Sequence, residues 1–320
     1  MPSERELIVE ESRGQQRLDK YLAQSLGLSR TELSRCLGAG LVLSPQSLKP
    51  SSLVRPGQSL LIDTDLLPVE EPPFDLETSE LGLDDFPVHV LYEDQDILVV
   101  SKGRDLVVQD GVHQDPRTLV NWLKIYLNRT VSAGEKGREG LVHRLDQATT
   151  GALVLAKTER AYQDLKGQFM ARSVRREYLG ICHGTPSSPR GQIRYPLARH
   201  PRRRQTFYCS PEGREAVSNF QILATTGSFS LLRLGLVTGR THQIRVHLKE
   251  IGCPLLGDPI YGREDASPFL ALHAQVLGLR LLSGEEKLFI CPLPDDWSDL
   301  LSSLWPESCL DLSPEAKSPF

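Results

Sequence analysis

Residues 143–156 read HRLDQATTGALVLA and join a charged turn to an apolar run. The run at 152–156 has the length and composition of a buried β-strand, and small residues ending at Gly151 precede it. Asp146 thus lies shortly before that strand, with Arg144 two residues away. A carboxylate placed in this way can be aimed rigidly and kept ionised at neutral pH. The alternative is an acid and an arginine paired in a surface turn.

Length and composition indicate a globular protein of two domains, because 320 residues exceed what one small core requires. No apolar stretch reaches membrane-spanning length, and the charged start does not resemble a signal peptide. The six cysteines are scattered without a Cys-x-x-Cys pair, which argues against a zinc ribbon and a disulfide framework. We therefore expect a cytoplasmic protein with no membrane partner.

The net charge of −4 conceals a strong segregation of charge along the chain. Residues 61–96 hold 12 Asp or Glu and no Lys or Arg, whereas residues 166–204 hold ten Lys or Arg and the single acid Glu177. A basic block on an acidic protein indicates a local surface for a polyanion such as nucleic acid. The alternative is a solvated, arginine-rich face without a partner.

Residues 16–66 have the pattern of a small module with two helices and a hairpin. Leu18, Leu22 and Leu26 share one helical face, capping-box spacing at 29–32 opens a second helix, and strand-like runs follow. The segment resembles the ribosomal protein S-four-like RNA-binding domain in RLDKYL (17–22), LSR (28–30) and VRPG (54–57), although SPQ (44–46) replaces the usual Asn-Gly tip. The resemblance implies RNA contacts by four basic residues, Arg17, Lys20, Arg30 and Arg35.

A second, larger domain is expected after an acidic, proline-containing linker at 67–85. From 86 to 297 strand-like runs outnumber helical ones, which occur near 118–127 and 161–169. This pattern predicts an α+β fold with a mixed, largely antiparallel sheet, preceded by the small N-terminal α/β domain. The final segment, 298–320, is expected to be a tail that frays.

Several reaction types can be tested against the polar residues of this larger domain. His242 and His247 are spaced poorly for a helical metal pair and face opposite sides of a strand, which argues against a metal. No Gly-x-Ser-x-Gly elbow is present for a serine hydrolase. A glycosidase needs a second acid, and Asp258, before a proline in a Gly-flanked turn, is more readily a turn former. One carboxylate, a tyrosine and arginines remain.

At this point residues 88–297 resemble the RluA-type family of RNA pseudouridine synthases. The resemblance rests on ordered blocks: HRLDxxTTG (143–151), RxYL (176–179), GRTHQIRVHL (239–248), GDPIYG (257–262), LHA (272–274) and PLP (292–294). It implies an isomerase that detaches uracil from its ribose and rejoins it through carbon. Because nothing is oxidised and nothing is added, no cofactor and no metal are expected.

The resemblance also implies roles for individual residues. Asp146 matches the catalytic aspartate, Tyr178 the active-site tyrosine and Arg245 the arginine that pairs with the aspartate. Arg144 matches the arginine that fills the duplex stack after the uridine has left it. Whether Tyr178 stacks on the base or also takes part in proton transfer is left open.

Three departures from the family pattern stand out. Residues 102–105 read KGRD where Lys-Pro-x-Gly is usual, and the lost proline is expected to loosen a loop beside the active site. Thr150 replaces a serine and keeps its hydroxyl, while Arg176 replaces a lysine and keeps its charge. None of these changes removes a catalytic group, so we expect an active enzyme.

The basic run at 199–204 is the strongest candidate for an RNA-gripping loop outside the motifs. Its contacts would come from Arg202, Arg203 and Arg204, although a solvated hairpin tip is the alternative. The expected partner is structured RNA bound by a monomer. Large-subunit ribosomal RNA is favoured because the N-terminal module is typical of such members; transfer RNA, or a non-catalytic role in ribosome assembly, is the alternative.

Overall fold

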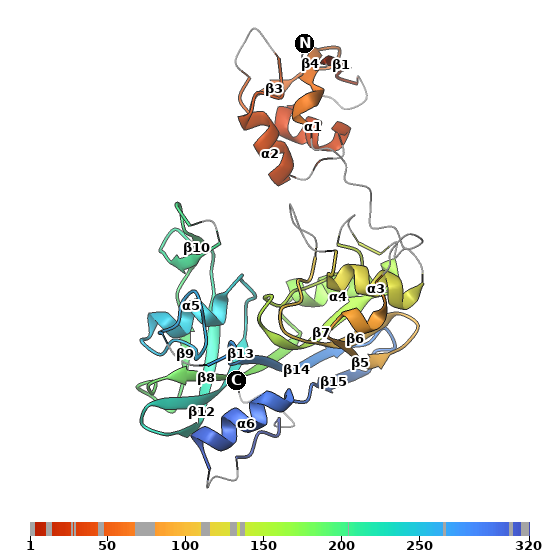
Figure 1. The fold of residues 1–320 in the computed structure, drawn as a ribbon. Coiled ribbons are helices and arrows are strands. Elements are labelled where there is room, and N and C mark those ends of the chain that lie inside the picture. Colours follow the sequence, from red (N-terminus) through yellow and green to blue (C-terminus); the bar gives the residue numbers. More distant parts are fainter. Residues whose placement is uncertain are drawn as a thin grey trace. The chain divides into compact units, whose positions relative to one another are not determined.

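The structure is a computed structural model in which the chain divides into two compact units, Met1–Asp75 and Leu76–Phe320 (Figure 1). It describes residues 4–10, 15–26, 28, 30–43, 48–67, 81–109, 116–128, 133–134, 138–203, 205–264, 267–306, 310–314 and 320, with the side chains of 30–32 excepted. The expected linker at 67–85 therefore falls largely outside the described residues.

The smaller unit packs two helices against short antiparallel strands. Its elements are β1 (Glu4–Ile8), β2 (Gln16–Arg17), α1 (Leu18–Leu26), α2 (Arg30–Gly38), β3 (Leu53–Val54), β4 (Ser59–Asp63) and the 3-10 helix η2 (Thr64–Leu66). Leu18 and Leu22 of α1 are fully buried against β4 residues such as Ile62, which explains the leucine spacing. β1 pairs with β4 over five residues, so this unit includes a strand before residue 16 that the sequence pattern did not indicate.

The larger unit is built on a nine-stranded sheet in the order β5-β6-β7-β14-β8-β13-β12-β9, with β15 paired to β14. The strands are β5 (Val88–Glu93), β6 (Ile97–Lys102), β7 (Thr150–Ala156), β8 (Arg175–His183), β9 (Arg190–Arg194), β12 (Val217–Thr225), β13 (Phe229–Leu236), β14 (Leu272–Arg280) and β15 (Glu286–Ile290). Among the described strands only β7 and β14 pair in parallel. The predicted α+β fold with a largely antiparallel sheet is confirmed.

Helices cover both faces of this sheet. They are α3 (Leu119–Leu127), α4 (Glu159–Met170), α5 (Gln243–Glu250) and α6 (Asp295–Leu304), with the 3-10 helix η3 (Leu83–Asp85) before β5. Because successive strand residues face opposite sides, Tyr178 of β8 joins the core that includes α3, α4 and α5, whereas Leu179 joins the core formed with α6. Figure 1 shows α6 on the opposite side of the sheet from α4 and α5.

The 143–156 segment lies at the centre of this arrangement. All seven residues of β7 are buried, with β6 on one side and β14 on the other. Gly151 has φ +124°, and a Cβ atom there would lie 2.3 Å from the carbonyl oxygen of Ala274 in β14. The glycine of the motif is therefore required by the close approach of two strands.

The C-terminal segment differs from the expected tail. α6 runs to Leu304, and Trp297, Leu301 and Trp305 are buried against the sheet. Their spacing of four residues places them on one side of the helix, which is the physical reason that the ordered domain extends beyond residue 297.

Candidate active site

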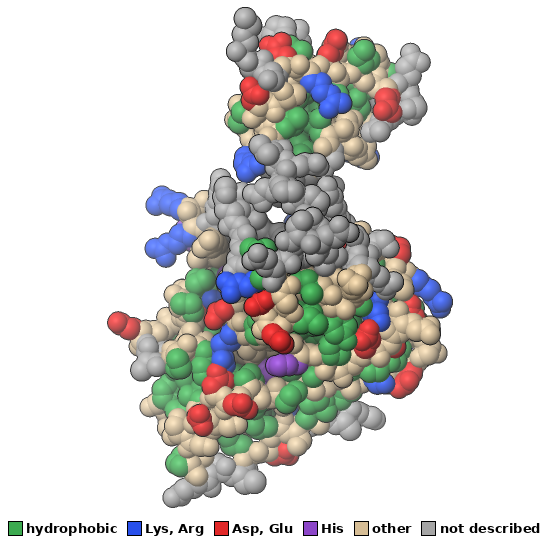
Figure 2. Space-filling model, turned by 45° about the vertical axis from the view of Figure 1, so that its right-hand side comes forward, with side chains coloured by type: hydrophobic (Ala, Val, Ile, Leu, Met, Phe, Trp, Pro, Cys, Tyr) green, Lys and Arg blue, Asp and Glu red, His purple; other side chains and the backbone are tan. Residues whose placement is uncertain are grey.

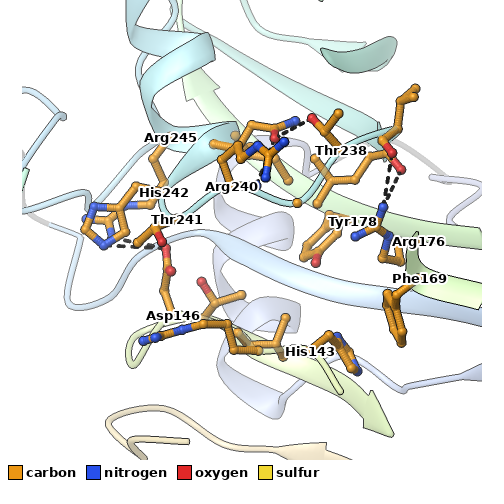
Figure 3. A pocket seen from close by; sticks show the side chains of 18 of the residues that line it. His143, Asp146, Phe169, Arg176, Tyr178, Thr238, Arg240, Thr241, His242 and Arg245 are labelled. Atoms are coloured by element: carbon orange, nitrogen blue, oxygen red, sulfur yellow. Dashed lines mark hydrogen bonds and ion pairs between the residues drawn. The ribbon is translucent and has the colours of Figure 1, made fainter. Parts of the chain in front are cut away.

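An open cavity of about 460 Å³ lies on the side of the sheet that carries α4 and α5. Its walls come from the segment 142–146, from α4, from β8 and from the segment 236–245 that leads into α5. Figure 3 shows Asp146 and His143 on one side, with Thr241, His242 and Arg245 facing Asp146 and with Tyr178 and Arg176 beside them. The tertiary structure thus gathers three separate sequence motifs.

Asp146 is held by Arg245, as the resemblance implied. Its Oδ2 lies 3.3 Å from Nη1 of Arg245, whose side chain is only 4% exposed, whereas that of Asp146 is 17% exposed. Arg144 is exposed, so the surface-turn alternative, in which Arg144 pairs with the acid, does not describe the geometry. The carboxylate is oriented by a buried cation and stays open to the cavity.

Asp258 is the residue of this site that the sequence analysis missed. It accepts hydrogen bonds from Nε and Nη2 of Arg245, both at 2.8 Å, and its side chain is 0% exposed. Its Oδ1 also accepts from the amides of Ile260 and Tyr261, so it forms the turn as well. The same carboxylate forms the turn and the ion pair with Arg245, and the Asp-Pro pattern in the sequence indicates only the turn.

The contacts of this cluster shift the pKa values of Arg245 and Asp258. Burial alone would lower the pKa of Arg245, but hydrogen bonds and attraction from Asp258 and Asp146 outweigh it and leave that pKa raised. Burial alone would raise the pKa of Asp258, but Arg245 and the two amides lower it. Arg245 and Asp258 are therefore ionised at neutral pH, and Arg245 is fixed between its two partners.

Tyr178 lies beside the pair on β8 and is 7% exposed. Burial raises the pKa of its hydroxyl to about 12, an effect that nearby Arg176 opposes and Asp146 strengthens. At neutral pH Tyr178 is therefore a neutral phenol that can donate a hydrogen bond and stack on an aromatic base. Arg176 Nη2 donates to the carbonyl oxygens of Leu236 and Val237, so the substituted cation keeps a structural position in the wall.

His242 completes the side of the cavity that faces Asp146. It precedes α5 with φ +57°, and its Nε2 lies 3.9 Å from Oδ2 of Asp146. Burial lowers its pKa, an effect that Asp146 opposes. His247 instead contacts Ser218 and the carbonyl of Tyr195, so the two histidines do not converge. Among the described residues no cluster of three potential metal ligands is found.

The loop at 102–105 is anchored, contrary to the expectation that the lost proline loosens it. The buried Nζ of Lys102 donates to the carbonyl oxygens of Gly103, Leu106 and Gln147. Gly103 N donates to the carbonyl of Pro87 at 2.6 Å, and Arg104 forms an ion pair with Asp296. A Cβ atom at Gly103 would lie 2.5 Å from Pro87 Cβ, so this contact replaces the rigidity of a proline.

The peripheral residues predicted to bind RNA are distributed over both units. Arg202 and Arg203 are exposed on the hairpin of β10 (Leu197–Arg199) and β11 (Phe207–Cys209), while Arg204 lies outside the described residues. In the smaller unit Arg17 pairs with Asp19, and a cavity of about 600 Å³ is lined by these two residues and Lys20. The remaining two are Arg35, which is exposed, and Arg30, which begins α2 but whose side chain is not described.

On the face of the larger unit seen in Figure 2, the described Lys and Arg side chains do not form one continuous basic surface. Figure 2 shows a face on which Lys and Arg side chains are interspersed with Asp and Glu. The basic block read from the sequence is therefore distributed by the fold. Part of it enters the cavity wall, as Lys166, Arg172 and Arg176 do, and part projects from the hairpin.

Comparisons with known proteins identify the family of this chain. The family model described as RNA pseudouridylate synthase matches residues 96–250. The RNA pseudouridine synthase YlyB of Bacillus subtilis is 35% identical over 93% of this chain and 97% of its own length. Ribosomal large subunit pseudouridine synthase D of Haemophilus influenzae is 35% identical over 90% of this chain and 91% of its own.

Solved structures show the same architecture. Human RNA Pseudouridylate Synthase Domain Containing 4 has a TM-score of 0.55 at 26% identity, covering 69% of this chain and 94% of that one. Human RNA Pseudouridylate Synthase Domain Containing 1 has a TM-score of 0.57 at 24% identity, covering 76% and 94%. The fold and the family are those of an RNA-modifying isomerase that converts uridine to pseudouridine. The chain belongs to the RluA-type family of RNA pseudouridine synthases.

Proposed function

We propose that this enzyme isomerises specific uridines of large-subunit ribosomal RNA, with Asp146 as the reacting carboxylate. The observation that carries this proposal is the series of ion pairs Asp146–Arg245–Asp258, in which Arg245 and Asp258 are buried and the carboxylate of Asp146 faces the cavity. The ribosomal substrate is supported by the relative from Haemophilus influenzae, whose name specifies the ribosomal large subunit.

The proposed chemistry follows from charges that the cavity supplies. As the bond between N1 and C1′ of uridine breaks, positive character develops on the sugar, and Asp146 either adds to C1′ or stabilises that charge. Uracil then turns, and its C5 bonds to C1′ as any bond between Asp146 and C1′ breaks. The proton lost from C5 is balanced by the proton that N1 gains. Tyr178, a phenol at neutral pH, packs on the base and can donate a hydrogen bond to it. Arg245 keeps the carboxylate of Asp146 oriented toward C1′ during these steps.

RNA delivery requires groups outside the cavity. The target base has to leave its stack, and the exposed Arg144, which lines the cavity, can occupy the vacated position. Arg202 and Arg203 are placed to bind phosphates, and the smaller unit offers Arg17, Lys20 and Arg35. Among the described residues no helix has the length and apolar character of a membrane span. The described cysteines are all free thiols, which supports work in the reducing cytoplasm.

A tritium-release assay on RNA that carries 5-tritiated uridine tests this proposal. Wild-type protein should release tritium from large-subunit ribosomal RNA, and Asp146→Asn should abolish release while RNA affinity stays within about threefold. Release from transfer RNA alone would refute the ribosomal substrate. Substantial turnover by Asp146→Asn would refute the role of the carboxylate.

A further inference from the structure

We propose that Tyr261 and His242 are positioning residues that connect the β10–β11 hairpin to Asp146, so that RNA held by the hairpin sets the alignment of the catalytic carboxylate. This inference rests on the proposed role of Asp146. It is carried by a continuous series of contacts between residues that lie far apart in the sequence.

The series starts at the hairpin and ends in the cavity. The backbone N–H of Phe207, the first residue of β11, donates to the hydroxyl oxygen of Tyr261 at 2.8 Å. That hydroxyl lies 2.9 Å from Nδ1 of His242. Nε2 on the other side of the imidazole lies 3.9 Å from Oδ2 of Asp146. A second route also passes through Tyr261, whose backbone N–H donates to Asp258, which in turn holds Arg245 against Asp146.

The direction of these hydrogen bonds follows from the number of protons available. The oxygen of Tyr261 already accepts a hydrogen bond from the N–H of Phe207, and Tyr261 is 4% exposed. If Nδ1 of His242 also donated to that oxygen, the phenolic proton would be left without its partner in a buried setting. The favoured arrangement has Tyr261 O–H donating to Nδ1, which places the ring proton of neutral His242 on Nε2, facing Asp146.

His242 is held in this orientation by its backbone as well. Its φ of +57° is left-handed, a conformation that residues with a Cβ adopt at a cost, and its side chain does not cap α5. Strain of this kind persists where surrounding contacts fix the residue. Here the imidazole packs edge-on against the rings of Phe207 and Tyr261, with centroids 5.8 and 5.5 Å away.

Tyr261 also contacts the arginine that holds the carboxylate. Its ring lies 5.1 Å from the guanidinium carbon of Arg245. On the hairpin side, Arg199 of β10 pairs with Phe207 of β11 in the β-ladder, and its guanidinium lies 5.4 Å from the ring of Phe207. A phosphate that draws the hairpin arginines therefore moves Phe207, and with it the hydroxyl of Tyr261 and the imidazole. The gap of 3.9 Å is longer than a hydrogen bond, so RNA contact closes it and adds a second donor to Asp146.

The test is Tyr261→Phe, which removes one oxygen and keeps the ring beside Arg245. We expect the single-turnover rate at saturating RNA to fall about tenfold to a hundredfold, the range for misplaced reacting groups, while RNA affinity stays unchanged. The melting temperature should fall slightly, because the N–H of Phe207 and Nδ1 of His242 lose their partner. The matched control is Tyr208→Phe on the same hairpin, because the side chain of Tyr208 is exposed. This variant should react at the wild-type rate. Unchanged turnover by Tyr261→Phe would overturn the proposal, whereas an inactive wild type would instead overturn the proposed function.

A spectroscopic readout separates positioning from mere packing. Two-bond ¹H–¹⁵N spectra of histidine-labelled protein, with His242→Gln for assignment, should show a protonated Nε2 in wild type and a mixture of tautomers in Tyr261→Phe. The same mixture in both proteins would overturn the donor order. Replacing Arg202 and Arg203 with alanine should lower the saturating rate in wild type but add little in Tyr261→Phe. Full additivity of the two changes would refute the link to the hairpin.

Discussion

Asp258→Asn tests how the active site is held more directly than any change at Asp146. Asparagine keeps the shape of the side chain and the oxygen that accepts from the amides of Ile260 and Tyr261. It removes the charge and turns an N–H₂ group toward the guanidinium of Arg245, which is 4% exposed. Breaking a buried ion pair on one side costs about 3–5 kcal/mol, and we expect a loss of that size in the free energy of unfolding.

The same substitution should slow the reaction. With asparagine at 258, Arg245 loses the hydrogen bond at 2.8 Å from its Nε to Oδ2, so only the hydrogen bond from Nη2 holds its plane and its Nη1 is less firmly aimed at Asp146. We expect the single-turnover rate to fall by about a hundredfold, as for other small misplacements of reacting groups. RNA affinity should change little, because Asp258 is buried and does not line the cavity.

Urea unfolding followed by tryptophan fluorescence measures the loss of stability. The three tryptophans, at 122, 297 and 305, all lie in the larger unit, so the signal reports that unit alone. Asp296→Asn is the matched control, since its side chain is 40% exposed and its ion pair with Arg104 should contribute less than about 1 kcal/mol. If Asp258→Asn is no more destabilising than Asp296→Asn and reacts at the wild-type rate, the reasoning fails.

Three further outcomes are expected. His273 is fully buried, and burial lowers its pKa to about 4, so as the pH falls the unfolded chain takes up this proton before the folded chain does. The contribution of His273 to the free energy of unfolding should therefore fall by about 3 kcal/mol between pH 6.5 and 4. In urea titrations, His273→Asn should make the dependence of stability on pH less steep. Replacing Arg202 and Arg203 with alanine should reduce the slope of log affinity against log salt by about 1.5 in filter-binding assays. Gly103→Pro restores the usual proline but removes the N–H that donates to Pro87, and its Cβ would lie 2.5 Å from Cβ of Pro87. The midpoint of urea unfolding should therefore be lower for this variant than for the wild type.

Local features of the fold could be predicted because they depend on neighbouring residues. The apolar run that became β7 and the periodicity that became α3 and α4 were visible in the sequence, and both helices begin after a threonine, Thr118 and Thr158, that caps the first turn. β1 was missed because its pattern of exposed charged residues shows no buried face, and only its partner β4 defines it as a strand.

The sequence by itself therefore determined the fold class, the position of Asp146 before a buried strand and, through ordered motifs, the family. What only the tertiary structure decided is how residues far apart in the chain share protons and charge. Asp146 and Arg245 are 99 residues apart, and Asp258 appeared to serve only a turn until Arg245 was placed against it. The series from Phe207 through Tyr261 to His242 likewise exists only after β11 lies beside α5, since hydrogen bonds depend on distance in space and not on spacing along the chain.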